Sequence, residues 1–220
     1  MTHCGDIPGR IDHTVLRPDA TSDDVARFCH EALQYGFRSV CVNPCRVSLA
    51  ASILGDDGPM VCSVAGFPLG SGPATPHEVE LAVSHGAREI DAVIPLGLLK
   101  DGAAPAVSAL LKQIVGSAGV PVKVIIETCL LTNDEKVLAC RLAVDAGASC
   151  VKTSTGFSTG GATVEDVALL RRTVGDGVHV KASGGIKTPG AVLAMLAAGA
   201  SIIGTSSGVM ILQELRRPEG

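Results

Sequence analysis

Residues 149–183 read SCVKTSTGFSTGGATVEDVALLRRTVGDGVHVKAS and contain the pattern that decides the fold. An apolar run, Ser149–Thr153, leads into a glycine-containing loop, and an amphipathic segment, Thr163–Val174, follows that loop. A second apolar run, Val178–Ala182, then ends in another loop with two glycines. A strand, a helix and a second strand in this order predict two parallel neighbouring strands joined by the helix.

The same alternation extends along the whole chain. Eight apolar runs within 220 residues predict an α/β fold, a closed (β/α)₈ TIM barrel that forms a single domain over residues 1–220. A doubly wound open sheet is the alternative, but no Gly-x-Gly-x-x-Gly motif follows the first run. The predicted strands are Arg10–Leu16, Ser39–Val42, Met60–Ala65, Glu89–Ile94, Val120–Ile126, Ser149–Thr153, Val178–Ala182 and Ser201–Ile203.

Several segments between the predicted strands carry helix signals. They open with Thr, Ser or Asn followed by acidic residues or proline, which are preferred at helix starts. A Gly-Ala pair precedes three of the strands, at a position where glycine suits the end of a helix. The predicted helices are Ala20–Tyr35, Thr75–His85, Asn133–Ala146, Thr163–Val174 and Thr188–Ala198.

The composition predicts a soluble protein with a core of small aliphatic residues. Hydrophobic residues make up 46% of the chain, aromatic ones only 2%, and the formal net charge is −4. No Lys/Arg cluster stands out, so we expect no nucleic-acid partner. Because no long apolar run and no signal peptide are present, we expect no membrane association and a cytoplasmic location. The eight cysteines form no Cys-x-x-Cys motif, so neither disulfides nor a metal site are expected.

A lysine stands near the end of both apolar runs in the opening stretch. Lys152 and Lys181 occupy the carboxyl ends of neighbouring predicted strands, where barrels of this kind place their active sites. Such strands lie about 4.8 Å apart, so two inward ammonium groups would repel each other and lower the pKa of the pair. A neutral lysine can attack a carbonyl and form a Schiff base. The alternative is that each lysine extends along the surface with its charge in water.

Acidic residues within the predicted strands are further candidates. Asp91 lies inside the apolar run Glu89–Ile94, where a carboxylate has to be paired or hydrogen-bonded. We expect it to form a structural salt bridge or to pair with a barrel lysine for proton transfer. Asp12 and Glu127 are weaker candidates of the same kind. Lys123 lies at the start of its strand, so we expect it at the opposite, non-catalytic face, in a structural role.

The loops after the last two predicted strands are rich in glycine and serine. Residues 183–187 read SGGIK, and residues 204–208 read GTSSG. Backbone N–H groups in such loops can surround an anion, and barrels often hold phosphate after their seventh and eighth strands. Ordinary turn glycines are the alternative interpretation. The predicted phosphate contacts are Gly184, Gly185, Lys187, Gly204, Ser206 and Ser207.

Taken together, these motifs resemble the deoxyribose-phosphate aldolase family over nearly the whole chain. VKTSTGF at 151–157 comes closest to being decisive by itself, and the order of the motifs is highly specific. They are IDHTVL (11–16), VCVNP (40–44), GFPLG (66–70), EIDAVIPLG (89–97), VKVIIET (122–128), VKTSTGF (151–157), VKASGGIKT (180–188) and GTSSG (204–208).

The resemblance implies a class I aldolase that reversibly cleaves 2-deoxy-D-ribose 5-phosphate to acetaldehyde and D-glyceraldehyde 3-phosphate, in deoxyribonucleotide catabolism. By position, Lys152 matches the family's Schiff-base lysine, Lys181 its second lysine and Asp91 the carboxylate of its proton relay. The two Gly/Ser-rich loops match its phosphate positions. We expect phosphosugar and aldehyde substrates, no metal or organic cofactor, and a homo-oligomer, either a dimer or a tetramer. Expected substrate contacts are Asp12, Thr14, Cys41, Thr155 and Gly156, with Cys41 interpreted as a core thiol rather than a nucleophile.

Two departures from the family pattern stand out. Ile202 occupies a position in the last strand where the family often has arginine, which we interpret as a lost structural contact. The chain ends in RRPEG, without the C-terminal tyrosine that some members use near the substrate. Two alternative functions remain: a Schiff-base barrel aldolase acting on a keto sugar acid or a ketose phosphate, and a phosphosugar-binding barrel without catalysis.

Overall fold

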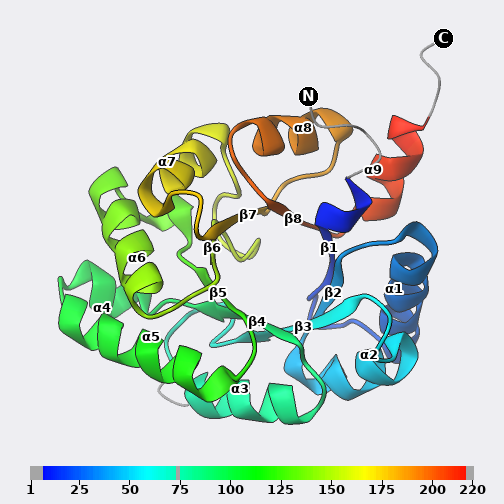
Figure 1. Ribbon diagram of the computed structural model, residues 1–220, viewed down its shortest axis with the longest axis horizontal. Helices are drawn as coiled ribbons and strands as arrows, with labels where there is room; N and C mark the ends of the chain where they lie inside the picture. The colour runs from blue at the N-terminus through cyan, green and yellow to red at the C-terminus, as the bar shows by residue number, and fades with distance from the viewer. Residues whose placement is uncertain (1–6, 73–74, 217–220) are drawn as a thin grey trace.

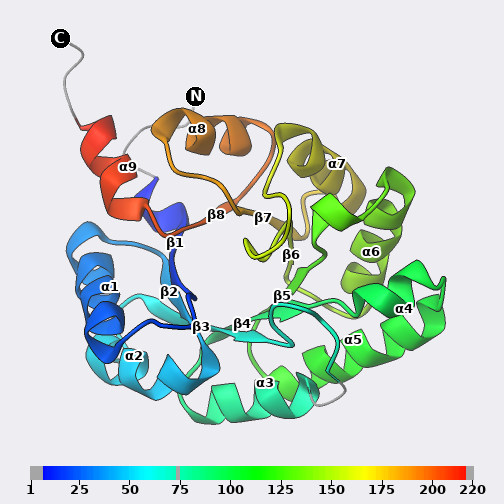
Figure 2. The ribbon, with the colours of Figure 1, turned by 180° about the vertical axis from the view of Figure 1, so that it is seen from behind.

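Eight parallel strands form a closed barrel in the computed structural model, which describes residues 7–72 and 75–216. The strands follow one another in chain order around the barrel, and the last pairs with the first. Helices surround them on the outside (Figure 1, Figure 2). The predicted (β/α)₈ barrel is therefore confirmed, and the open sheet is excluded. The strands are β1 (Ile11–Val15), β2 (Ser39–Val42), β3 (Met60–Ala65), β4 (Glu89–Val93), β5 (Val122–Ile125), β6 (Cys150–Lys152), β7 (His179–Ser183) and β8 (Ile202–Thr205).

Threonine caps begin several of the helices that the sequence predicted. Thr21 accepts a hydrogen bond from the Asp24 N–H at the start of α1, and Thr132 accepts one from the Glu135 N–H at the start of α6. In both places the acidic side chain bonds back to the threonine N–H, which completes a capping box. The helices are α1 (Ser22–Tyr35), α2 (Val47–Leu54), α3 (Thr75–Ser84), α4 (Leu96–Lys100), α5 (Ala104–Ala118), α6 (Asn133–Asp145), α7 (Val164–Val174), α8 (Pro189–Ala197) and α9 (Gly208–Leu215), with 3₁₀ turns η2 (Pro8–Arg10), η3 (Pro44–Arg46) and η4 (Thr128–Leu130).

Helices α2, α4, α5 and α9 were not predicted. None of the four begins with a side-chain hydrogen bond at its cap, so the usual start signal is missing. They are stabilised by packing instead, as shown by Leu54 of α2 and Ile114 of α5, which are buried in the main core. Strand β8 also differs from the prediction, because it extends to Thr205 and includes Gly204, which was expected in the following loop.

The main hydrophobic core fills the space between the barrel and the helices. It consists mostly of Val, Ile, Leu and Ala, as the composition predicted. Most strand residues are buried, as is usual when helices cover a parallel sheet. The interior of the barrel is different, because it contains charged side chains that are at most 2% exposed. These are Asp12, Asp91, Lys123, Lys152 and Lys181.

The strand register aligns the two lysines of the opening stretch. Lys152 on β6 is the direct partner of Lys181 on β7. Side chains of directly paired residues point to the same face of a sheet. The two lysines therefore extend side by side into the barrel, near the carboxyl ends of the strands.

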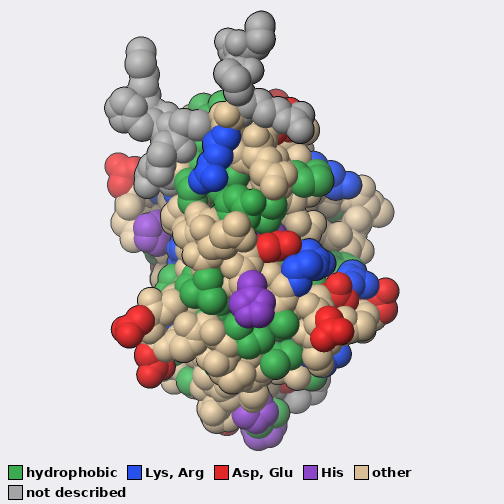
Figure 3. Space-filling view, turned by 90° about the vertical axis from the view of Figure 1, so that its right-hand side faces the viewer, with side chains coloured by type: hydrophobic (Ala, Val, Ile, Leu, Met, Phe, Trp, Pro, Cys, Tyr) green, Lys and Arg blue, Asp and Glu red, His purple; other side chains and the backbone are tan. Residues whose placement is uncertain are grey.

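The outer surface on the side of α1 and α9 carries acidic, basic and hydrophobic side chains that are interspersed (Figure 3). This mixture agrees with the small formal net charge of −4. In residues 7–72 and 75–216, no helix is both long enough and apolar enough to cross a membrane.

Candidate active site

Asp91 joins the two lysines inside the barrel. Its side chain on β4 is fully buried, and its Oδ2 accepts hydrogen bonds from Lys152 Nζ at 2.7 Å and from Lys181 Nζ at 2.8 Å. Burial by itself would raise the pKa of Asp91, but Lys123, Lys152 and Lys181 outweigh it and hold that pKa well below its usual range. Asp91 therefore carries a negative charge between two amines.

Asp12 on β1 provides a second carboxylate for Lys181. Its Oδ2 lies 2.5 Å from Lys181 Nζ, and its Oδ1 lies 2.6 Å from Nη1 of Arg38. Burial would raise the pKa of Asp12, but the charges of Lys181, Lys123 and Arg38 hold it far below the ordinary value. Asp12 therefore lies beneath the site as an ion-pair partner.

Repulsion between the two lysines was expected to lower the pKa of the pair, but Lys181 does not follow this expectation. Burial would lower the pKa of Lys181, but Asp12 and Asp91 outweigh burial and raise that pKa above its ordinary value. Lys181 is therefore held as an ammonium ion. The expected repulsion left out the carboxylate of Asp91, which lies between the two amines.

Lys123 is also part of this network, which corrects its expected place on the non-catalytic face. Its side chain is 1% exposed, and its Nζ donates to Glu89 Oε2 at 2.6 Å and to Asp91 Oδ1 at 3.1 Å. Although Lys123 lies near the start of β5, it is paired with Asp91 and points into the barrel. Arg38 closes the network from below by bonding to Glu89.

Four cations and three carboxylates make up the buried network. The imbalance of one positive charge is removed when one amine is neutral. Within residues 7–72 and 75–216, Lys152 has a single carboxylate partner, whereas the other two lysines each have at least two. The cations are Lys123, Lys152, Lys181 and Arg38, and the carboxylates are Asp12, Glu89 and Asp91.

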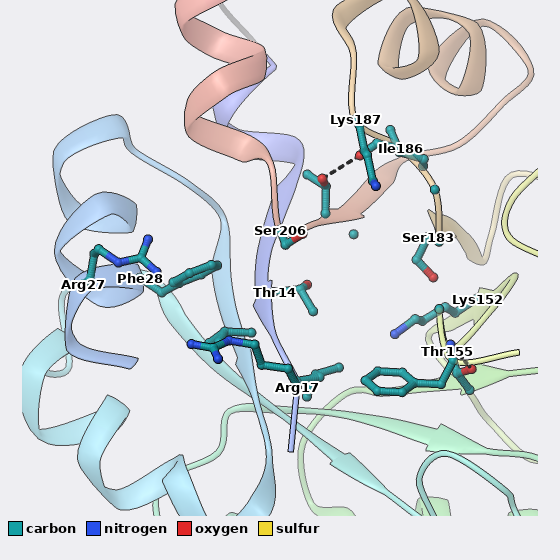
Figure 4. A pocket seen from close by; sticks show the side chains of 18 residues that line it. Thr14, Arg17, Arg27, Phe28, Lys152, Thr155, Ser183, Ile186, Lys187 and Ser206 are labelled. Atoms are coloured by element: carbon teal, nitrogen blue, oxygen red, sulfur yellow. Dashed lines mark hydrogen bonds between the residues drawn. The ribbon is translucent and has the colours of Figure 1, made fainter. Parts of the chain in front are cut away.

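A cavity of about 480 Å³ lies over Lys152 at the carboxyl ends of the strands. The lysine reaches it from one side, next to Thr155, with Ser183 above (Figure 4). Of the three interior lysines, Lys152 alone lines the cavity, while Lys123 and Lys181 stay beneath it. A small molecule in this cavity would therefore meet the amine of Lys152.

The two Gly/Ser-rich loops, which follow β7 and β8, form another part of the cavity wall. Gly184 and Gly185 both have positive φ, at 89° and 79°, a conformation that glycine adopts without strain. Ser207 does not line the cavity, because it precedes α9 and its N–H donates to Thr205 Oγ1 at 2.9 Å. The predicted phosphate residues in the wall are Gly184, Gly185, Lys187, Gly204 and Ser206.

The expected substrate contacts separate into two groups. Thr14, Thr155 and Gly156 line the cavity. Asp12 and Cys41 are fully buried and do not line it, which corrects their expected direct contact. Cys41 packs in a small hydrophobic cluster inside the barrel, in agreement with its interpretation as a core thiol.

Cys41, Cys62 and Asp91 bring two sulfurs and a carboxylate within 4.8 Å of one another, a set that could hold a metal ion. The surroundings oppose one, because Lys123 Nζ lies 3.5 Å from Cys62 Sγ and 3.1 Å from Asp91 Oδ1. Its positive charge would repel a cation at the same place. The Asp91 carboxylate instead accepts hydrogen bonds from the three lysines.

Some cavity residues were not predicted. Arg17 follows β1 and Arg27 lies on α1, and both are paired with Asp24 at the cavity edge. Phe157 packs edge-on against Phe67 at 5.3 Å and forms an apolar part of the wall. Exposed arginines next to acidic residues resemble ordinary surface pairs, so only the fold reveals their position. The unpredicted wall residues are Val15, Leu16, Arg17, Arg27, Phe28, Phe157, Ser183, Ile186 and Thr205.

The two departures from the family pattern have different outcomes. Ile202 is 4% exposed and is paired with Lys181 across β7 and β8, so an apolar side chain occupies the position. The last four residues of the RRPEG ending, 217–220, lie outside the described part of the chain.

Comparison with known proteins agrees with this site. A family model described as DeoC/LacD family aldolase matches residues 9–214. The deoxyribose-phosphate aldolase of Thermococcus gammatolerans is 53% identical, with 97% of this chain and 98% of that protein covered. The enzyme of the same name from a Geobacillus strain is 55% identical, with 92% and 93% covered. The solved structure of deoxyribose phosphate aldolase from Aeropyrum pernix, described as tetrameric, has a TM-score of 0.88 at 38% identity, with 97% and 92% covered.

These similarities, with the barrel and its buried lysines, define the chain as an aldolase, an enzyme of the lyase class. The chain belongs to the DeoC/LacD family of aldolases, and its resemblance to deoxyribose-phosphate aldolase is confirmed over nearly its whole length.

Proposed function

We propose that the protein reversibly cleaves 2-deoxy-D-ribose 5-phosphate to acetaldehyde and D-glyceraldehyde 3-phosphate through a Schiff base on Lys152. One observation carries the mechanism: the amine of Lys152 reaches the cavity while it is bonded at 2.7 Å to the buried Asp91. The names of the similar proteins support the substrate.

The reaction begins with attack of the neutral Lys152 amine on the aldehyde carbon of the open-chain sugar. Loss of water gives an iminium ion, which accepts the electron pair as the C2–C3 bond breaks. The C3 hydroxyl loses its proton, D-glyceraldehyde 3-phosphate leaves, and an enamine remains on Lys152. Protonation of the enamine carbon and hydrolysis of the imine release acetaldehyde and restore the amine.

The access of Lys152 to the cavity and the contacts of the other two lysines support Lys152 as the amine that reacts. Lys181 is held charged between Asp12 and Asp91, and Lys123 is bonded to Glu89 and Asp91. In this proposal, Asp91 and Lys181 hold and move the protons that the reaction requires. Both lie within hydrogen-bond distance of each other and next to the reacting amine.

The phosphate of the substrate would bind where the loops after β7 and β8 form the cavity wall. Gly184 and Gly185 turn the backbone after β7, and Lys187 adds a positive charge at the cavity wall. Ser206 lies beside them after β8. This end of the cavity combines backbone N–H groups, a hydroxyl and an ammonium ion, which together suit a phosphate.

Reductive trapping tests the proposal. Incubation with acetaldehyde and borohydride should add the reduced two-carbon unit to the peptide that contains Lys152. Lys152→Leu should abolish trapping and sugar-phosphate cleavage while far-UV circular dichroism stays native, and Lys112→Leu, on the exposed side of α5, should change neither. A label on Lys181 would reverse the assignment. Trapping with pyruvate or dihydroxyacetone phosphate, but not with acetaldehyde, would favour a different aldolase.

We also infer a cytoplasmic homo-oligomer, either a dimer or a tetramer, that serves deoxyribonucleotide catabolism. The tetrameric description of the Aeropyrum pernix relative supports an oligomer. Light scattering during size-exclusion chromatography measures its mass, and a monomer at micromolar concentration would contradict this inference.

A further inference from the structure

Glu127 has an unusual backbone conformation next to the cavity. It lies two residues after β5, with φ 55° and ψ 66°, in the left-handed region that residues other than glycine rarely occupy. Such a conformation persists only when the surrounding structure enforces it, and it is often found near functional sites. The side chain is also buried, at 2% exposure. Two unfavourable features therefore coincide at one residue.

The carboxylate of Glu127 is bound almost entirely by one other residue. Thr155 donates its N–H to both carboxylate oxygens at 3.3 Å, and its hydroxyl donates to Oε2 at 2.5 Å. The thiol of Cys129 is a weak third donor at 3.9 Å. Within residues 7–72 and 75–216, no lysine, arginine or histidine forms a salt bridge with Glu127. The carboxylate is thus committed to Thr155.

This contact determines the polarity of the Thr155 hydroxyl. A hydroxyl has a single hydrogen, and because it is given to Glu127, the oxygen can only accept elsewhere. The Phe157 N–H already donates to that oxygen at 3.1 Å. Thr155 lines the cavity beside Lys152 (Figure 4). Any contact of this hydroxyl with a bound substrate would therefore be as an acceptor.

We propose that Glu127 is a positioning residue, which fixes the Thr155 hydroxyl as an acceptor for a hydroxyl group of the substrate and holds the loop from Thr155 to Phe157 over Lys152. The inference rests on the proposed function, because it requires a hydroxylated aldehyde phosphate in the cavity. It assigns Glu127 an effect on the substrate without direct contact, because Glu127 itself does not line the cavity.

Glu127→Gln tests whether the Thr155 hydroxyl acts as an acceptor, because glutamine has nearly the same shape as glutamate. The amide oxygen can still accept from the Thr155 N–H, but the amide nitrogen would donate to the Thr155 oxygen and turn its hydrogen toward the cavity. We expect kcat/KM for cleavage of deoxyribose 5-phosphate to fall about tenfold, the effect of one hydrogen bond. Borohydride trapping of acetaldehyde should change by less than about twofold, because acetaldehyde has no hydroxyl group.

A double-mutant cycle shows whether Glu127 acts through Thr155. Thr155→Val removes the hydroxyl, so adding Glu127→Gln should lower kcat/KM no further than Thr155→Val alone. Losses that multiply would overturn the proposal, as would wild-type kinetics in Glu127→Gln. Failure of the wild-type enzyme to cleave the sugar or to be trapped would instead contradict the proposed function.

Two further variants separate the carboxylate from the backbone. Glu127→Gly suits the left-handed conformation and should fold, yet it should lose cleavage at least as strongly as Glu127→Gln. Full activity in this variant would mean that only the turn matters. Glu135→Gln is the matched control, because Glu135 also accepts from a threonine N–H, that of Thr132 at 2.7 Å, but at the start of α6. It should leave the kinetics unchanged.

Discussion

A single oxygen atom of Asp91 is the point where the two central lysines meet. Oδ2 accepts from both, so the charge of each lysine depends on the other through a shared partner. Lys181 has Asp12 as an additional partner and remains charged. We propose that it acts electrostatically as well as in proton transfer, within a network that, among the described residues, contains four cations and three carboxylates.

Lys181→Leu tests that role. The substitution removes the ammonium group that shares Asp91 Oδ2 with Lys152, so the repulsion between the two amines is lost. We expect trapping on Lys152 at neutral pH to slow by at least tenfold, since about 1.4 kcal/mol of added stabilisation of the ammonium form is enough for that factor. Raising the pH should recover part of the rate. The pH dependence of borohydride trapping measures this, and coinciding profiles in both proteins would contradict an electrostatic role.

The buried charges also predict how stability depends on pH. The pKa values of Asp12 and Asp91 are lowered on folding, so their contribution is present above the ordinary value near 3.8 and is lost as the pH falls below it. The pKa of Lys181 is raised, so its contribution is present below 10.5 and is lost above it. Urea titrations should show the free energy of unfolding dropping between pH 5 and pH 3, by about 1 kcal/mol for each carboxylate.

Asp12→Asn gives the control for the acid side. It should lower the stability at neutral pH, because Lys181 and Arg38 then lose a buried partner. The loss between pH 5 and pH 3 should be smaller than in the wild type. An equally steep loss would show that other carboxylates dominate the acid unfolding.

The sequence predicted the residues at the strand ends better than those at the strand starts. Lys152, Lys181 and Asp91 could be found because each interrupts an apolar run within a recognisable motif. Lys123 and Arg38 could not, because they lie near strand starts and their long side chains reach inward from there. The rotamer of a side chain determines how far it extends along the barrel axis. The sequence pattern does not predict the rotamer.

At the scale of the elements, side-chain caps decide which helices could be predicted. Helices α1, α6, α7 and α8 begin with a threonine that accepts from the backbone, whereas α2, α5 and α9 begin without one. Capped helices carry a local signal in a few residues. Uncapped helices form through packing on the barrel, which depends on distant residues.

Thr132→Ala tests the contribution of a cap. The capping box of α6 loses its acceptor for the Glu135 N–H, so the free energy of unfolding should fall by about 1 kcal/mol. Urea denaturation measures the change. Because α6 lies on the outside of the barrel, kcat should stay at its wild-type value, and a lower kcat would link this helix to the site.

The two serines after β8 should respond differently to added negative charge. Ser206 lines the cavity, whereas Ser207 precedes α9, where an acid is favourable next to the helix start. Ser206→Glu should lower kcat/KM for deoxyribose 5-phosphate about a hundredfold, since two unit charges about 5 Å apart repel by about 3 kcal/mol at a dielectric constant near 20.

Unphosphorylated deoxyribose is the control substrate for this pair. Its turnover by Ser206→Glu should fall by less than about threefold, because no phosphate is present to be repelled. Ser207→Glu should affect the phosphorylated substrate less than Ser206→Glu does. Equal losses with both substrates would mean that the acid disrupts the loop rather than a phosphate site.

At the scale of the whole molecule, closure of the barrel creates the site. The network residues Asp12, Asp91, Lys123 and Lys181 come from β1, β4, β5 and β7, and no local pattern relates them. The number of alternating units predicted that the sheet closes. The strand register then decides which side chains lie at the same height along the barrel axis. It pairs Asp91 with Lys123 and Lys152 with Lys181.

The charged layer beneath the cavity also limits where protons can go. Asp12, Asp91, Lys123 and Lys181 are at most 1% exposed, so in the described part of the chain the network meets solvent at Arg38, whose side chain is 19% exposed, and where Lys152 enters the cavity. A bound substrate covers that opening. A proton taken from the substrate then has no bulk water in the cavity with which to exchange, and it remains stored among the buried groups.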